Sequence, residues 1–182
     1  CQRQTSFQTT TYCSPFKYFR DICCPRPEME IIQPFALSPR HPTLQKYINL
    51  SGEPLDVDRI QRSKRAWLKI SISCAVQDGN LRTSLIAQVG QTTTFQWSRT
   101  VGTEDDTNMY YTHLGGIWEA TTYITTAMTK IRMHPARIWA TIFTNNRSTL
   151  QALAAPARQS GQRLIGQITQ RITDIHNTGR WI

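Results

Sequence analysis

The most regular stretch of the chain alternates apolar and polar side chains from residue 68 to residue 76. Apolar side chains and one cysteine occupy the even positions, while lysine and serine occupy positions 69, 71 and 73. Because successive strand side chains point to opposite faces, this repeat predicts a strand with one buried face. The Asp-Gly pair within residues 77–80 predicts a tight hairpin turn. Residues 81–90 and 92–101 predict two further strands, so an antiparallel three-stranded meander is expected.

A helix is expected over residues 103–131. Glu104, Asp105 and Asp106 favour its N-terminus, because acidic side chains interact favourably with the positive end of the helix dipole. One stripe faces a core and recurs every three or four residues, at Ile117, Thr121, Ile124, Met128 and Ile131. Gly115 and Gly116 weaken a helix, and glycine there permits close packing on the sheet.

The remaining pattern adds a strand, two helices and the start of another strand. Residues 136–144 are apolar and β-branched, which predicts a fourth, central strand. A short helix is expected to end at Pro156, and an amphipathic helix is expected over residues 160–179. Residues 180–182 then read as a fifth strand cut off at its start. The predicted fold is α/β, with a mixed five-stranded sheet and helices on both faces.

Residues 1–65 differ from the rest because they hold seven of the nine prolines. Proline lacks the amide donor and fixes φ, so long regular elements are not expected there. Short helices are predicted at residues 15–22 and 42–48. The predicted organisation is a connector or arm over residues 1–65, followed by an α/β domain over residues 66–182.

The net charge of +9 is spread along the chain. Up to residue 66 there are ten Lys and Arg against six Asp and Glu, and after it eleven against six. A diffuse positive charge suits a polyanionic partner such as nucleic acid. No apolar run approaches the length of about 18 residues that a membrane span needs. No membrane contact is therefore expected.

The five cysteines do not have the spacing of a zinc site, and four lie in the first 24 residues. They are interpreted as reduced thiols of an intracellular protein, in the nucleus or the cytoplasm. The N-terminus lacks the apolar core of a signal peptide. Because the chain begins with Cys1 rather than Met, a fragment or a processed product is expected.

Three segments of the sequence resemble segments that occur together in one protein family. The segment IFTNNRSTLQAL, followed by SGQRLIGQI, resembles the ribonuclease H domain of reverse transcriptases from fungal non-LTR (LINE-like) retrotransposons. YYTHLGGI is similar to the first helix of that domain. SPFKYFRDICCPRPEMEIIQPFALSP is similar to the connector between the polymerase and ribonuclease H domains. The resemblance implies a ribonuclease H-like fold, an upstream reverse transcriptase domain as partner, and RNA/DNA hybrid as substrate.

The family cleaves RNA with two Mg²⁺ ions held by carboxylates, and the resemblance places these positions on other residue types here. The fourth-strand aspartate falls on Asn145 and the helix glutamate on His113. The first-strand aspartate falls on Asp78, or on Cys74 in a register four residues earlier. Asp78 is favoured as the one metal ligand, because it continues the alternating apolar face. One carboxylate cannot hold two Mg²⁺ ions, so bound Mg²⁺ is not expected.

Other acidic residues do not replace the missing ligands. Glu119 points about 240° around the helix from His113, and Asp174 is expected to be solvated on the last helix. The preferred hypothesis is therefore a catalytically inactive ribonuclease H domain of a retroelement reverse transcriptase. A further hypothesis is a transposon relic without selected function.

The alternative hypothesis is a non-enzymatic module that binds nucleic acid or protein through a basic surface. Phosphate contacts can hold a duplex without cutting it. The arginines considered for such contacts are Arg82, Arg99, Arg132, Arg137, Arg147 and Arg158.

Overall fold

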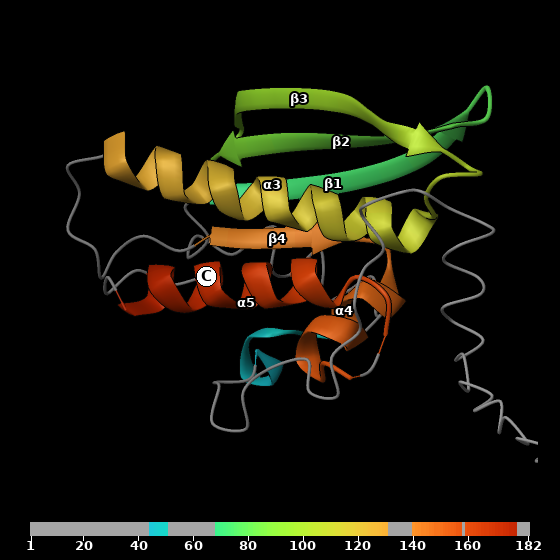
Figure 1. Ribbon diagram of the computed structural model, residues 1–182. Coiled ribbons are helices and arrows are strands. Elements are labelled where there is room, and N and C mark those ends of the chain that lie inside the picture. The colour runs from blue at the N-terminus through green and yellow to red at the C-terminus, as the bar shows by residue number, and fades with distance from the viewer. Residues whose placement is uncertain (1–43, 51–67, 131–139, 158, 178–182) are drawn as a thin grey trace, which may run out of the picture. The chain divides into compact units, whose positions relative to one another are not determined.

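The computed structural model describes residues 44–50, 68–130, 140–157 and 159–177, all within the unit Ile32–Ile182. Within these residues, four strands form one mixed sheet in the order β3-β2-β1-β4, and three α-helices accompany it (Figure 1). The elements are η1 (Gln45–Tyr47), β1 (Leu68–Gln77), β2 (Asn80–Val89), β3 (Thr92–Thr103), α3 (Met109–Lys130), β4 (Ala140–Thr144), α4 (Arg147–Ala154) and α5 (Gln162–Asn177).

The pairing of the strands confirms the predicted meander. β1 pairs with β2 and β2 with β3, both antiparallel, whereas β4 runs parallel to β1 from Leu68↔Ala140 to Ile72↔Thr144. The β1–β2 connection is the predicted two-residue turn. Its central residues Asp78 and Gly79 both have positive φ, 52° and 70°, which matches the right-handed twist of the flanking strands.

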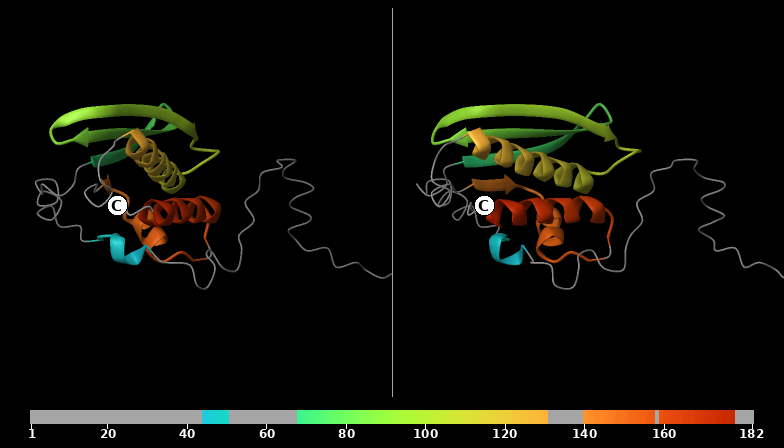
Figure 2. Two further views of the ribbon diagram at one scale, coloured as in Figure 1. Left: turned by 90° about the vertical axis from the view of Figure 1, so that its left-hand side faces the viewer. Right: turned by 60° about the vertical axis from the view of Figure 1, so that its left-hand side comes forward.

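The core lies between one face of the sheet and α3. Ile70 is fully buried on this face, whereas Ser71 and Ser73 on the opposite face are exposed. In Figure 2, α3 lies along the sheet and α5 lies beside α3, and the two helices are in contact. The helices that the structure describes leave Ser71 and Ser73 uncovered, so helices on both faces are not found. The physical reason is the strict alternation in β1, since a strand covered on both faces would be apolar throughout.

Helix α3 begins later than its acidic residues suggested. The acids Glu104–Asp106 lie in a turn after β3, and the Asn108 Oδ1 atom caps the helix by accepting from the Tyr111 backbone N–H at 2.9 Å. A local side-chain cap therefore sets this helix start in place of the dipole effect. The predicted stripe is confirmed at Ile117, Thr121 and Ile124, which are buried. Ile131 and the Met128 side chain lie outside the described residues.

The second half follows the prediction with shorter elements. β4 is described from Ala140, and the apolar stripe of α5 is buried at Ile165, Ile168, Ile172 and Ile175. No helix among the described residues is long and apolar enough to cross a membrane.

Several predictions fall outside the described residues and stay predictions. They concern the fifth strand at 180–182, the helix at 15–22, the domain boundary after residue 65 and four of the five cysteines. The helix predicted over 42–48 is present in part as the short η1. Leu44, which precedes it, is buried in the same core as β1 and α3.

Candidate functional site

The site positions implied by the resemblance lie where β1 and β4 end their pairing. The last parallel pair is Ile72↔Thr144, so Asn145 lies level with Ser73, and Cys74 lies one residue further along β1. Asp78 lies five residues beyond Ser73, which at about 3.3 Å per residue is roughly 16 Å along the strand. The structure therefore groups Cys74, and not Asp78, with Asn145.

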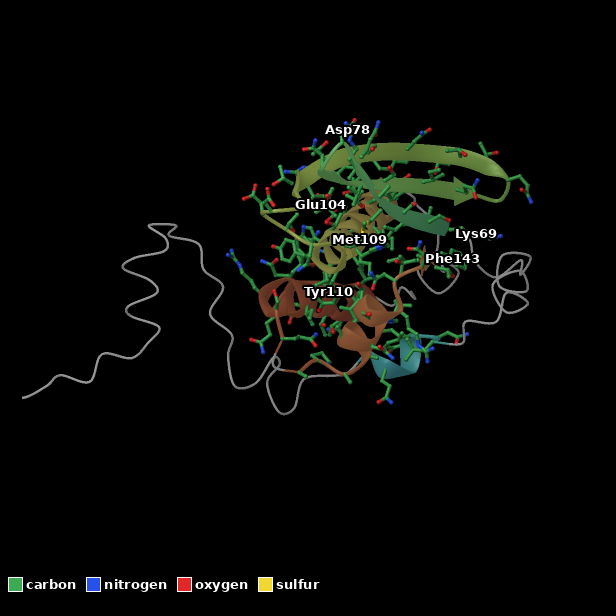
Figure 3. All side chains as sticks on the ribbon, turned by 90° about the vertical axis from the view of Figure 1, so that its right-hand side faces the viewer. Lys69, Asp78, Glu104, Met109, Tyr110 and Phe143 are labelled. Atoms are coloured by element: carbon green, nitrogen blue, oxygen red, sulfur yellow. The ribbon has the colours of Figure 1, made fainter. Side chains whose placement is uncertain are left out.

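Asp78 occupies the hairpin turn and its side chain is exposed. The Glu104 backbone N–H donates to the Gly79 carbonyl oxygen at 3.0 Å, which joins the turn to the end of β3. Figure 3 shows Asp78 and Glu104 at the same end of the sheet. The sequence suggested Asp78 because the alternating face appeared to continue past β1. The left-handed backbone of the turn ends that alternation, so the register with Cys74 has the better geometry.

His113 lies in the second turn of α3 and is only 3% exposed. Its Nδ1 atom is hydrogen-bonded to the Thr144 hydroxyl at 3.1 Å, which joins α3 to the end of β4. Burial lowers the pKa of His113 below its usual value near 6.5. At neutral pH the imidazole is therefore uncharged.

Cys74 lies on the same face of the sheet, half-buried, and its thiol donates to the Thr83 hydroxyl at 3.4 Å. Burial raises the pKa of the Cys74 thiol, and the hydrogen bond with Thr83 opposes this effect only in part. The thiol is therefore protonated at neutral pH, and a protonated thiol is a poor metal ligand.

Gly116 explains how closely α3 approaches this end of the sheet. A Cβ atom at Gly116 would lie 2.7 Å from Ile72 Cγ2 and 2.8 Å from Thr83 Oγ1, whereas one at Gly115 would meet nothing within 4 Å. The predicted close packing thus belongs to Gly116 alone. Since Gly116 is three residues after His113, both lie on the side of α3 that faces the sheet.

The start of α4 completes the arrangement. Asn146 caps this helix, because its Oδ1 atom accepts from the Thr149 backbone N–H at 2.9 Å and from the Thr149 hydroxyl at 3.0 Å. The Asn146 backbone N–H donates to the Thr144 hydroxyl at 3.3 Å. Asn145 itself is exposed. The resemblance pointed to Asn145 and missed its two neighbours, although the Asn-x-x-Thr spacing is a signal of a helix cap.

This donor set does not fit Mg²⁺. The ion prefers oxygen ligands, usually carboxylates, whereas the side chains here are a thiol, an imidazole, hydroxyls and amides. Among the described residues, no three His, Cys, Asp or Glu side chains come together to hold a metal ion. Glu119 is half-exposed on α3, and the exposed Asp174 on α5 accepts a hydrogen bond from Gln170 at 2.8 Å.

The candidate arginines do not share one face of the sheet. Thr83 pairs with Arg99, so Arg99 lies on the α3 side, whereas its neighbour Arg82 lies on the opposite side and donates to Gln77 Oε1 at 2.7 Å. Arg147 is exposed in the first turn of α4. Arg132, Arg137 and Arg158 lie outside the described residues.

The described residues carry little of the positive charge. They contain eight Lys and Arg against six Asp and Glu, a net charge of +2 out of the total of +9. Four of these acids, Asp78 and Glu104–Asp106, are exposed at the hairpin end of the sheet. A basic surface is therefore not a property of the whole described fold, and the hairpin end has the opposite charge.

Comparison with solved structures gives a weak likeness of fold, and two other comparisons find no match. No protein-family model and no curated protein matches the chain. Among solved structures the chain is similar to LC11-RNase H1 in complex with an RNA/DNA hybrid, with a TM-score of 0.44 and 8% sequence identity over 63% of this chain and 81% of that one. A likeness at this level carries no argument about function.

Proposed function

We propose that this chain is a ribonuclease H-like domain that does not hydrolyse RNA. The three similar sequence segments and the order of the elements support this assignment. Three antiparallel strands are followed by a helix and by a strand parallel to the first. One observation carries the loss of catalysis. Where the pairing of β1 with β4 ends beneath α3, the side chains are the Cys74 thiol, the His113 imidazole and the Thr144 hydroxyl, and Asn145 follows Thr144 in the chain.

Hydrolysis by two metal ions requires negative oxygen ligands that offset the charge of two divalent cations. The thiol and the imidazole are neutral at pH 7, and each is hydrogen-bonded to a threonine hydroxyl: Cys74 to Thr83 and His113 to Thr144. The one acid that the sequence offered, Asp78, lies in the hairpin turn four residues beyond Cys74, where its side chain is exposed. The fold is thus present without the charge that the reaction needs.

The retroelement context is part of the proposal and rests only on the similarity of the three sequence segments. In that context the domain would follow a reverse transcriptase polymerase domain in one polyprotein. The domain would act there as a folded spacer or as a binding surface, without cutting the hybrid.

The test is a cleavage assay of the 182-residue chain on an RNA/DNA hybrid with Mg²⁺ and with Mn²⁺. We expect no product above the level of a heat-denatured sample. Metal-dependent cleavage that Cys74→Ala, His113→Ala or Asp78→Asn abolishes would overturn the proposal.

A second candidate function is non-enzymatic binding of nucleic acid at the same end of the sheet. Arg99 lies in one cross-strand row with Thr83 and Cys74, on the face that α3 covers. Arg147 follows Asn145 by two residues at the start of α4. These two exposed guanidinium groups lie on elements that border the former metal position, whereas Arg82 lies on the other face.

Binding is tested by titrating a labelled RNA/DNA hybrid at several salt concentrations. The affinity is expected to fall steeply with salt, because phosphate contacts release counterions. Arg99→Gln and Arg147→Gln are expected to weaken binding and lower the salt slope by about one each, while Arg82→Gln serves as the matched control. An equal loss with Arg82→Gln would show that binding is not specific to the face that α3 covers.

A further inference from the structure

We infer that the residues at and beside the former metal position now form a structural staple that ties α3 and α4 to the end of β4. The staple consists of His113, Thr144, Asn146 and Thr149. The inference rests on the proposed function, which identifies this position as the former metal site, and it adds a role that the residues have gained.

The staple is a continuous chain of hydrogen bonds between elements that are far apart in the sequence. His113 Nδ1 on α3 pairs with Thr144 Oγ1 on β4, 31 residues later. Thr144 Oγ1 also accepts from the Asn146 backbone N–H, and Asn146 Oδ1 accepts from both the backbone N–H and the hydroxyl of Thr149. One hydroxyl therefore connects the helix before β4 with the helix after it.

The hydrogen-bonding capacity of Thr144 matches its neighbours. A hydroxyl has one proton and two lone pairs. When one lone pair accepts from Asn146, the Thr144 hydroxyl can donate its proton to His113 Nδ1 or accept from Nδ1–H with the other lone pair. The ring is neutral in both arrangements. An uncharged imidazole thus fits the site without any cation.

The burial of the staple gives these bonds their value. His113 is 3% exposed and Thr149 is fully buried. Removing one partner from a buried pair leaves a polar group unsatisfied, which costs more than the hydrogen bond itself contributes. Gly116, three residues beyond His113, lets α3 approach the sheet closely on the same side of the helix. The staple therefore fixes the end of β4 relative to α3 and to the start of α4.

A carboxylate at position 113 would be incompatible with this arrangement. It would place a negative charge in the buried space beside the Thr144 hydroxyl, where the imidazole is now neutral. An isolated buried charge is strongly unfavourable. The present residues are thus suited to an uncharged connection between α3, β4 and α4. They occupy the position of the proposed former metal site.

The test is a double-mutant cycle on the 182-residue chain, followed by thermal unfolding. Thr144→Val and His113→Leu are each expected to lower the Tm by about 3–8 °C, and the double variant by no more than the larger single effect. Thr144→Ser keeps the hydroxyl and is expected to retain most of the stability. Thr125→Val, which removes a hydroxyl bonded to the Thr121 carbonyl within α3, is the control and should add to His113→Leu.

Hydrogen exchange of the wild-type chain gives a second measurement if a variant does not fold. The Asn146 and Thr149 amides are expected to be protected, and Thr144→Ser should preserve that protection. Additive effects of Thr144→Val and His113→Leu, or fast exchange of the Asn146 amide in the wild type, would overturn the staple. Hybrid cleavage by the wild-type chain would overturn the proposed function instead, so the two failures are distinguishable.

Discussion

Two regions along strand β1 differ in where charge is placed: the hairpin end, where the chain turns into β2, and the buried end of the β1–β4 pairing beneath α3. At the hairpin end, Asp78 lies close to Glu104, and all four acids of this region are exposed to water. At the buried end, the buried His113 and the half-buried Cys74 are both neutral at pH 7. A solvated carboxylate costs little, whereas a buried one without a metal or partner is expensive. The chain thus has acids where solvent stabilises them and neutral hydrogen bonds at the buried end.

The largest expected effect comes from placing carboxylates at the buried end. Cys74→Asp, His113→Glu and Asn145→Asp together are expected to lower the free energy of unfolding by roughly 3–6 kcal/mol, because two of the three charges are buried without partners. Denaturant unfolding with and without Mg²⁺ measures this loss.

The matched control for these carboxylates is Ser73→Asp, which adds a charge on the exposed face of the same strand. It is expected to change stability by about 0.5 kcal/mol or less. A loss in the triple variant no larger than that of Ser73→Asp would contradict the comparison of the two regions. Recovery of the triple variant by millimolar Mg²⁺ would support the proposed former metal position.

Close packing at the buried end predicts a smaller loss. Gly116→Ala places a Cβ atom 2.7 Å from Ile72 Cγ2, which forces a shift and is expected to cost about 1–3 kcal/mol. Gly115→Ala is the control, because its Cβ meets nothing within 4 Å and alanine favours a helix by up to about 1 kcal/mol. Thermal unfolding of the two variants should move in opposite directions, and a common direction would refute the close approach of α3.

The neutral state of His113 predicts a dependence of stability on pH. Burial holds the pKa of His113 in the folded chain below that of the unfolded chain, which is about 6.5. The unfolded state therefore binds the proton first, so stability is fully present above about pH 6.5 and falls as the pH drops below it. His113→Leu should show a weaker fall between about pH 6.5 and pH 5, measured by denaturant titration. An unchanged pH profile would contradict a neutral, buried His113.

The smallest effect is expected at the hairpin end. Asp78→Asn keeps a side chain that tolerates the positive φ of 52°, so stability should change by about 0.5 kcal/mol or less. Hybrid binding should not weaken either, since Asp78 is far from Arg99 along the sheet. A loss of stability or of any metal response with Asp78→Asn would make Asp78 a site residue after all.

Much of the architecture could be predicted from the sequence, because periodicity and turn chemistry act over short distances. The alternation in β1, the Asp-Gly turn and the stripe of α5 each specify an element by themselves. The start of α3 is predicted too early, at residue 103, because the prediction relies on three acidic residues. The helix begins at Met109, after the cap residue Asn108. Helices on both faces were expected from the order of elements. The polar face of β1 was already an indication against them.

The candidate site could be predicted only in part. The resemblance led to His113 and Asn145, but it left the choice between Asp78 and Cys74 open. That choice depends on how β1 lies against β4, a pairing of residues about 70 positions apart. The pairing of Thr144 with His113 could not be predicted either. No local pattern in the sequence links a helix residue to a hydroxyl 31 positions later.

By itself the sequence determined the order of the elements and the faces of the strands, and it led to His113 and Asn145 as candidate site residues. These properties depend on residue type and local spacing. Only the tertiary structure decided that Asp78 is solvated in a turn, that Cys74 lies nearer than Asp78 to the end of the β1–β4 pairing and that His113 is buried against Thr144. Those outcomes depend on strand register and on the close approach of α3 at Gly116, and both arise from packing between distant parts of the chain.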